Sequence, residues 1–418
     1  MLIRQNRSVA SHEPRWAKWG LLTLVVYSAS LKKYSDEWIH EGPPFVPPLE
    51  AVIQYGRPIT ILLFVVLLFF MATQGNFTRC IQTTKPVAWL LVTQGVIVFK
   101  LLSSGDLDFA LQLSAVLIVL CLVMLFGLKS WLIKSSDIDA CIAAIAAVGA
   151  LFILLTSIQA EISASAIFVA NDRLNGTTGN AQHAAALLGA AAPAMFYMAI
   201  RHASWVRFIW LGLLAAAGCC IYMTGSRTGL AMFILGLGVV GNASGLRRMI
   251  IPTVAVITLS YLSFWAFGTE VVNTYDLFSN RITTLEDTRS DQWTYMWNTF
   301  LLNPLFGEEI NGGRLGFGEN SWLAIAATTG LLGLIPMLNF GLASLSILRN
   351  LSSARFNLEE RQQAAVVNAG LSSLLVGSIF EAYLLGTLCA PILFTMLYAT
   401  IGNALLTFAR QRAIVGRI

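Results

Sequence analysis

Residues 109–128 read FALQLSAVLIVLCLVMLFGL, twenty residues in a row without a charged side chain. A helix needs about 20 predominantly apolar residues to cross the ~30 Å hydrocarbon core of a bilayer. Similar stretches recur along the chain between short polar breaks. They predict twelve membrane-spanning helices, at residues 16–31, 58–73, 86–103, 109–128, 139–160, 180–200, 205–223, 228–241, 249–267, 320–347, 366–386 and 388–408.

The composition of the 418-residue chain agrees with this pattern, because 56% of its residues are apolar and only 12% are charged. Mean hydropathy is +0.69, whereas soluble domains carry about 25% charged residues. We therefore expect an all-α polytopic membrane protein in which residues 1–418 form a single transmembrane domain. The net charge of +5 lacks the basic and aromatic run typical of nucleic-acid binding, so we expect no nucleic-acid partner.

The basic residues predict how the chain is oriented in the membrane. With the N-terminus inside, 18 of the 27 lysines and arginines fall on the inner side and 9 on the outer side. Short loops rich in Lys and Arg stay in the cytoplasm, so we expect both termini there and a retained signal anchor as the first span. The basic residues left outside are Lys32, Lys33, Arg57, Lys100, Arg173, Arg227, Arg281, Arg289 and Arg314.

Residues 268–319, between the ninth and tenth predicted spans, form the longest predicted outer loop. Within it, Thr288-Arg-Ser-Asp291 is typical of a capping box, and aromatic residues then recur at helical spacing until Asn303-Pro304 ends the pattern. We expect a short helix whose aromatic face lies at the membrane surface or packs onto the spans. The glycine-rich residues 307–318 lack the Gly-Lys-Ser/Thr of a nucleotide-binding loop, which leaves a loop over a site or a plain connector.

Four outer arginines are candidate anion-binding residues. A guanidinium stays charged and binds phosphate oxygens in pairs. Arg227 lies between two glycines in Thr224-Gly-Ser-Arg-Thr-Gly229, where a ligand can approach closely. Pairing with lipid headgroups or neighbouring acids is the alternative for each arginine. A set on one face favours a pyrophosphate, and outside the cytoplasm this means a lipid-linked sugar donor. The four are Arg173, Arg227, Arg281 and Arg289.

Two acids and one histidine are candidates for chemistry at the same face. Glu319 opens the tenth predicted span, where it either complements the helix dipole or accepts a proton from a sugar hydroxyl. Glu381 falls inside the eleventh predicted span, and an intramembrane acid indicates either function or an ion pair with arginine. His183 follows Asn180 by three residues on the sixth predicted span, where packing and substrate contact are both open.

Two acidic pairs, Asp106-Leu-Asp108 and Asp137-Ile-Asp139, have the spacing with which some glycosyltransferases hold a divalent cation. Short acidic pairs in loops also arise by chance. We expect neither a metal nor another cofactor, and we keep metal use through Asp106 and Asp108 as an alternative.

Four motifs together resemble the superfamily of bacterial O-antigen ligases and O-antigen polymerases, which are membrane glycosyltransferases. The resemblance covers residues 165–345. It rests on Arg173 to Ala184 with Gly176, Gly179 and Asn180; on Gly225-Ser-Arg-Thr-Gly229; on Arg289, Trp293 and Asn303-Pro-Leu-Phe-Gly307; and on Glu319-Asn-Ser-Trp-Leu323 with Gly330-Leu-Leu-Gly333. Ligases of this family usually have a histidine where Glu319 stands, and this difference favours a polymerase.

The resemblance implies a GT-C-like fold and a metal-independent sugar transfer on the outer face of the bacterial inner membrane. The donor is then a glycan on polyprenyl pyrophosphate, and the acceptor is a second repeat unit or, for a ligase, a lipid A core. A chain-length regulator is a possible partner besides the membrane lipids. The implied roles are pyrophosphate binding by Arg173, Arg227, Arg289 and Arg281, catalysis by Glu319 and Arg227, and glycan contacts by Asn180, His183, Asn320 and Glu381.

A flippase or transporter of lipid-linked sugars is the competing interpretation, because it also needs outer arginines. Such a protein is expected to carry charged residues facing a cavity through the depth of the membrane. The predicted spans contain few charged residues and show no inverted repeat, which favours the enzyme.

Overall fold

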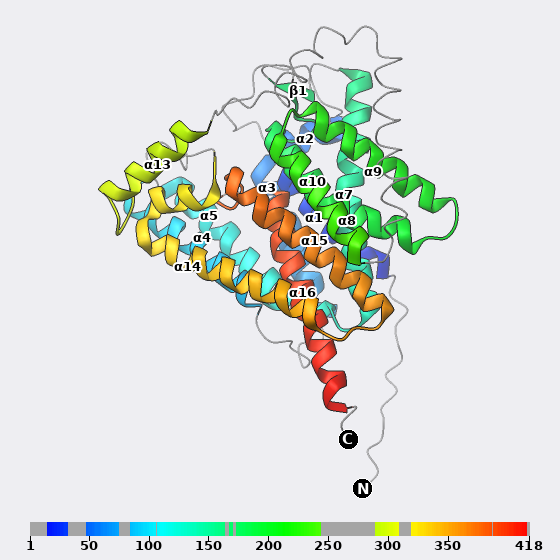
Figure 1. Cartoon of the computed structure of the whole chain (residues 1–418). Helices are drawn as coiled ribbons and strands as arrows, with labels where there is room; N and C mark the ends of the chain where they lie inside the picture. The colour runs from blue at the N-terminus through cyan, green and yellow to red at the C-terminus, as the bar shows by residue number, and fades with distance from the viewer. Residues whose placement is uncertain are drawn as a thin grey trace.

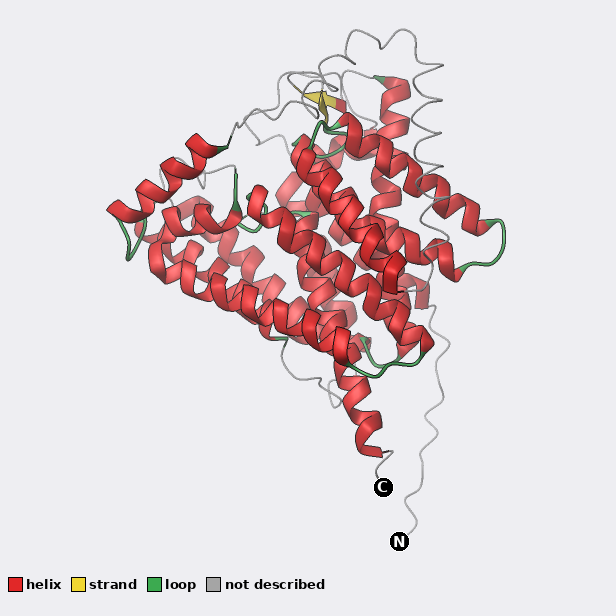
Figure 2. Cartoon of the chain, in the orientation of Figure 1, coloured by secondary structure: helices red, strands yellow, loops and turns green. Residues whose placement is uncertain are grey.

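The computed structural model describes residues 15–31, 47–74, 84–105, 107–163, 167–169, 173–243, 289–308, 319–386 and 388–415. These residues form a helical bundle with one small antiparallel pair of strands at one end (Figures 1 and 2). The elements are α1 (Arg15–Ser30), α2 (Pro47–Gln54), α3 (Gly56–Gln74), α4 (Lys85–Ser103), α5 (Leu107–Cys121), η2 (Leu122–Gly127), α6 (Leu128–Trp131), α7 (Ser135–Ile162), β1 (Phe168–Val169), β2 (Arg173–Leu174), α8 (Ala181–Arg201), α9 (Val206–Met223), α10 (Arg227–Ala243), α13 (Ser290–Leu302), α14 (Ser321–Ser353), α15 (Leu358–Phe380) and α16 (Ala390–Val415).

Eight helical segments of the described chain are long and apolar enough to cross a membrane, so the chain is a multi-pass membrane protein. Eleven of the twelve predicted spans coincide with described helices, and the predicted span 249–267 lies outside the described residues. Two further apolar helices, at 58–73 and 227–242, are shorter. The eight segments are Lys85–Ser103, Leu107–Trp131, Ser135–Ile162, Ala181–Arg201, Val206–Met223, Ser321–Ser353, Leu358–Phe380 and Ala390–Ile414.

Helix α8 lies at the centre of the bundle, in contact with α7, α9, α10, α15 and α16. Its middle, AAALLGAAAPA at residues 184–194, is almost entirely small or apolar and is buried throughout. Small side chains let neighbouring membrane helices approach closely, which compensates for the weak hydrophobic drive between helices in lipid. Gly229 of α10 packs directly on Ala185, and a side chain at this glycine would overlap that residue.

The boundaries of α15 correct one prediction. The sequence pattern places a span at 366–386, whereas α15 begins at Leu358 and ends at Phe380. Asn357 caps its start in a capping box with Glu360, so the acidic residues that read as loop form the first helical turn. Consequently Glu381 lies in the irregular connector to α16 and not within the spanning helix.

Helix α13 forms where the aromatic pattern predicts it and ends at Asn303 as expected. The expected capping box is different, because the N-cap position is Arg289, whose side chain makes no capping hydrogen bond, and Thr288 lies outside the described residues. One face of the helix is buried through Met296 and Phe300, while Trp297 and Tyr295 are exposed. The helix therefore packs through one face, and a position of the exposed aromatic residues at the membrane surface stays a prediction.

The turn after α13 docks onto a kink in α14. The N–H groups of Leu331 and Leu332 donate to the carbonyls of Pro304 (2.8 Å) and Leu305 (3.3 Å). This pairing requires glycine at Gly330 (φ 62°) and Gly307 (φ 70°), where a side chain would overlap the backbone of the opposite segment. The two sequence motifs that contain these glycines therefore contact each other.

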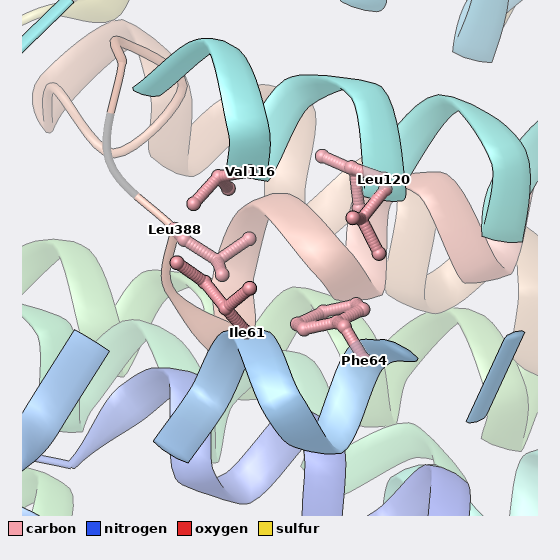
Figure 3. A pocket seen from close by; sticks show the side chains of 6 residues that line it. Ile61, Phe64, Val116, Leu120 and Leu388 are labelled. Carbon is pink, nitrogen blue, oxygen red and sulfur yellow. The ribbon is translucent and has the colours of Figure 1, made fainter. Parts of the chain in front are cut away.

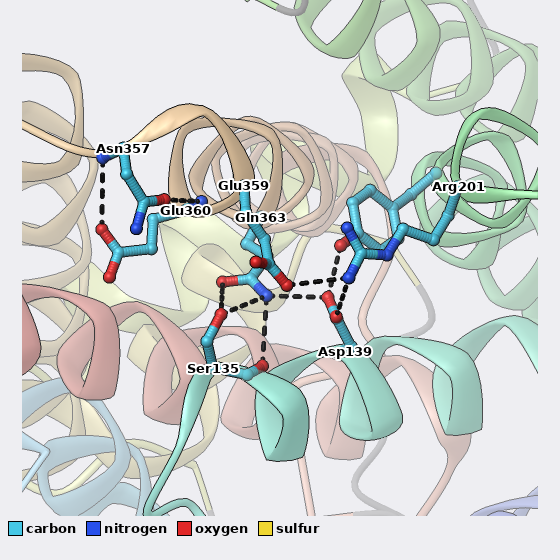
Figure 4. A network of polar contacts seen from close by, with 8 residues as sticks. Ser135, Asp139, Arg201, Asn357, Glu359, Glu360 and Gln363 are labelled. Carbon is cyan, nitrogen blue, oxygen red and sulfur yellow. Dashed lines mark hydrogen bonds and ion pairs between the residues drawn. The ribbon is translucent and has the colours of Figure 1, made fainter.

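A polar network at the opposite end of the bundle joins α7, α8 and α15 (Figure 4). Arg201 pairs with Asp139 (3.1 Å) and Glu359 (2.8 Å), and Gln363 Nε2 donates to Asp139 Oδ1 (2.7 Å). Asp137 accepts from the Lys134 N–H (2.9 Å) and caps α7. Both acids of the Asp137-Ile-Asp139 pair thus have structural partners.

Candidate active site

Arg289, at the start of α13, is the centre of a polar cluster that joins four parts of the chain. Its Nη2 atom donates to Glu381 Oε1 at 3.0 Å, and both Nη atoms lie 3.3 Å from Thr228 Oγ1. Its Nε atom lies 3.7 Å from Glu319 Oε2. The guanidinium also lies 5.6 Å from the centre of the Phe380 ring, close enough for a cation–π contact.

Glu381 is buried beside this arginine. It is 3% exposed, and its backbone carbonyl accepts from both the N–H (3.2 Å) and the hydroxyl (2.6 Å) of Ser321. Burial raises the pKa of the Glu381 carboxyl to about 7, against the opposing effects of Arg289, the Thr228 hydroxyl and Arg173. The negative charge of Glu319 adds to the upward shift.

Glu319 is the more accessible of the two acids. Its side chain is 26% exposed, against 4% for Glu381. Its Oε2 atom has no hydrogen-bond partner among the described residues, although it lies near Arg289 Nε. The Oε2 atom is itself buried, so the exposure of this side chain comes from its other atoms.

Asn320 and Asn180, expected as glycan contacts, both cap helices. Asn320 has a positive φ of 69°, which asparagine tolerates better than most residues. Its Oδ1 accepts from the N–H groups of Trp322 (2.9 Å) and Leu323 (3.1 Å) at the start of α14. Asn180 Oδ1 accepts from the Gln182 N–H (2.7 Å) at the start of α8. His183 lies half-buried in the first turn of α8.

The Thr224–Gly229 turn places two arginines beside the cluster. Gly225 adopts a positive φ of 61° after α9, and Ser226 Oγ accepts from the Gly229 N–H (3.1 Å) in the first turn of α10. Arg227 is exposed between Ser226 and Thr228, the residue that Arg289 contacts. Arg173 Nε donates to the Thr224 carbonyl at 2.7 Å. Arg281 lies outside the described residues.

The loop that follows Arg173 is packed into the bundle. Asn175 and Thr177 are fully buried. The hydroxyls of Thr177 and Tyr27, from α1, form a hydrogen bond of 2.7 Å. Gly176 (φ 57°) lies against Phe152 and Thr156 of α7, where a side chain does not fit. These contacts fix the segment that carries Arg173.

The ends of three helices add a favourable field for anions. Helices α8, α10 and α14 begin at Ala181, Arg227 and Ser321, at the same end of the bundle as the cluster (Figure 1). Helix N-termini carry partial positive charge and point backbone N–H groups outward. Together with three arginines against two glutamates, they make this end suited to an anionic ligand.

A metal site is not evident in the part of the chain that the structure describes, where no three His, Cys, Asp or Glu side chains cluster. Asp108 is exposed in the first turn of α5, and Asp106 lies outside the described residues. A small crevice between α3 and α5 has a purely apolar lining and offers no catalytic group (Figure 3).

Sequence reasoning missed several contacts of the cluster. Thr228 stands next to Arg227 in the quoted motif, so its position was a usable signal. Phe380 and Ser321 gave no such signal, because their roles depend on how the start of α14 lies beside the end of α15. Lys100 was counted only as an outer charge, but its Nζ donates to the carbonyls of Phe306 (2.6 Å) and Gly307 (3.1 Å).

Comparison with known proteins gives little further information. No protein-family model matches the chain, and no curated protein matches it. One similar solved chain comes from work described as "Structural coordination of polymerization and crosslinking by a peptidoglycan synthase complex". The identity is 13%, the match covers 86% of this chain and 98% of that chain, and the TM-score is 0.37. A TM-score this low assigns neither a fold nor an activity to the present chain.

Proposed function

We propose that this chain is a membrane glycosyltransferase with a GT-C-like architecture that polymerises lipid-linked oligosaccharide repeat units. The observation that carries the proposal is the contact of Arg289 with Thr228, Glu319 and Glu381, with Arg173 and Arg227 beside it. Residues from distant parts of the sequence thereby form one cluster of arginines and acids at the end of a membrane-spanning bundle.

The chemistry of this cluster suits a pyrophosphate leaving group. As the bond from the sugar to pyrophosphate breaks, negative charge develops on the leaving oxygens, and positioned guanidinium groups stabilise it. Arg227 is exposed, and Arg173 and Arg289 are half-buried, and we assign all three to contact with an anion whose lipid tail stays in the bilayer. Glu319 accepts the proton of the attacking hydroxyl, and the reaction needs no metal.

The location of buried charge favours an enzyme over a flippase. In the described part of the chain, the buried charged residues are Lys129, Glu360 and Glu381. Lys129 lies in the short α6, Glu360 in the first turn of α15, and Glu381 just after that helix. None lies midway along a span, where a charged translocation path is expected.

The proposed setting follows from the resemblance and the loop charges. The site faces the outside of a bacterial inner membrane, with both chain termini in the cytoplasm and with a chain-length regulator as a possible partner. Transfer to a lipid A core is the second candidate function. Glu319, in the place of a ligase histidine, favours the polymerase.

The test is product formation by the purified full chain in the presence of a chelator. Incubation with a lipid-linked oligosaccharide should lengthen the glycan despite EDTA, and Arg227→Ala and Arg289→Ala should abolish this. Arg355→Ala removes an exposed arginine between α14 and α15 and should have no effect. Elongation that requires a divalent cation, or that survives loss of Arg173, Arg227 and Arg289 together, contradicts the proposal. Offering lipid A core as the acceptor distinguishes ligase from polymerase.

A further inference from the structure

The two carboxylates beside Arg289 hold it in different ways. Glu381 makes a hydrogen-bonded ion pair of 3.0 Å from a side chain that is 4% exposed. Glu319 approaches the Nε atom only to 3.7 Å, is 26% exposed and forms no hydrogen bond through Oε2 within the described residues. Glu381 is therefore hydrogen-bonded to Arg289, whereas the Oε2 atom of Glu319, which is itself buried, lies near the guanidinium without a hydrogen bond.

A ligand displaces Glu319 from Arg289 more easily than it displaces Glu381, for two reasons. The contact of Glu319 with Arg289 is 3.7 Å long and carries no hydrogen bond, so it is weaker than the hydrogen-bonded pair with Glu381, and an anionic ligand meets less resistance there. The backbone at Glu319 is also fixed from the next residue, since Asn320 caps α14 through two hydrogen bonds. The Glu319 side chain is thus able to leave Arg289 by rotation alone.

The contacts of Glu381 explain why its side chain remains paired with Arg289 during the exchange. Its backbone carbonyl accepts a hydrogen bond from Ser321, and its carboxylate accepts one from Arg289 Nη2. Thr228 Oγ1, on α10, contacts both Nη atoms of the same arginine. Glu381 and Thr228 contact the Nη atoms of Arg289, whereas Glu319 lies at its Nε atom.

We propose that, in the reaction proposed above, the donor pyrophosphate takes the place of Glu319 on Arg289, and that the released Glu319 accepts the proton of the acceptor hydroxyl. Glu381 and Thr228 are positioning residues that keep the guanidinium in place throughout. Binding of the donor thereby frees Glu319 to act as the base. The identity of the anion in this inference rests on the proposed function.

In the proposed step one bond to the anomeric carbon forms as another breaks. The acceptor hydroxyl oxygen forms a bond to the anomeric carbon, and the bond from that carbon to the pyrophosphate oxygen breaks. The electron pair leaves with the pyrophosphate, which the arginines neutralise. The hydroxyl proton goes to the carboxylate of Glu319 and afterwards to water.

The test measures binding of geranylgeranyl pyrophosphate, a short polyprenyl pyrophosphate, to the full chain in detergent, together with glycan elongation. Glu319→Gln removes the competing charge, so this probe should bind about two- to fivefold more tightly, while elongation falls at least tenfold. Glu308→Gln removes the same charge from an exposed position after α13 and should change neither quantity. Glu319→Asp, which shortens the reach to Arg289, should also tighten binding and should retain part of the elongation.

Failure of the exchange and failure of the proposed function give different results. If both Glu319 variants fold, as judged by thermal unfolding, but bind the probe more weakly than the wild type, the exchange is wrong and the proposed function stands. If the wild-type protein does not bind the probe, or Arg289→Ala binds it equally well, the proposed function itself is wrong.

Discussion

The Nη2 atom of Arg289 lies 3.0 Å from the Oε1 atom of Glu381, although 92 residues separate them in the sequence. The pair links the start of α13 to the connector after α15. It places a fixed positive charge at the end of the bundle where Arg173 and Arg227 also lie.

Replacing Glu381 by glutamine should lower glycan elongation without lowering the stability of the protein. Burial raises the pKa of Glu381 to about 7, which means that the folded protein disfavours the ionised carboxylate relative to the unfolded chain. A neutral side chain of the same shape removes that cost, and Arg289, which is 24% exposed, keeps Thr228 and Glu319 as neighbours. We expect Glu381→Gln to unfold at the same or a higher temperature, while glycan elongation falls at least tenfold. A variant that unfolds much earlier would show that the ion pair is mainly structural.

The same group predicts a pH dependence of activity. Above its pKa of about 7 the Glu381 carboxylate is ionised and orients Arg289; below it, protonation removes the charge. Elongation by the wild-type protein should therefore decrease as the pH falls through about 7. The residual activity of Glu381→Gln should lack this decrease. An unchanged pH profile in the variant would assign the titration to another group.

The docked turn after α13 should be essential for placing Arg289. Gly330→Ala puts a side chain at φ 62° against the Leu305 backbone, and strain of this kind costs about 1–3 kcal/mol. We expect a lower unfolding temperature and a loss of elongation. Gly238→Ala is the matched control, because nothing lies within 4 Å of the added carbon in α10; it should stabilise by about 0.5–1 kcal/mol. Equal effects of the two variants would refute the role of the docked turn.

Tyr27→Phe should weaken the loop that carries Arg173. The change leaves the buried Thr177 hydroxyl without its partner, at a cost of about 1–3 kcal/mol in the free energy of unfolding. The double variant Tyr27→Phe with Thr177→Val removes both polar groups and should regain most of that loss. Chemical or thermal unfolding in detergent measures both. If the double variant is as unstable as the sum of the single ones, the hydrogen bond is not the cause.

Much of the fold is predictable because apolar stretches of span length are unambiguous. The stretch 139–160 is an example, and α7 covers it completely. The end of α15 was misplaced because Ser378 to Tyr383 continues the apolar pattern, whereas the contact of Ser321 with the Glu381 carbonyl ends the helix in three dimensions. A tertiary hydrogen bond of this kind has no signal in a single sequence.

The candidate residues were easier to find than their arrangement. Arginines in the predicted outer segments are conspicuous because few basic residues fall there. Their partners are not, since the distance from Arg289 to Glu381 depends on helix packing. Asn180 and Asn320 illustrate a second difficulty, because a polar residue before a span reads equally well as a ligand contact or as a helix cap. Both cap helices, and their glycan contacts stay predictions.

The central claim, that the arginine cluster stabilises a departing polyprenyl pyrophosphate, is tested most directly by counting that product. Mass spectrometry should find one polyprenyl pyrophosphate released for each glycosidic bond that the wild-type protein makes. Arg289→Ala should release almost none, and Arg355→Ala should match the wild type. Glycan elongation without release of the pyrophosphate lipid, or full release by Arg289→Ala, would contradict the account.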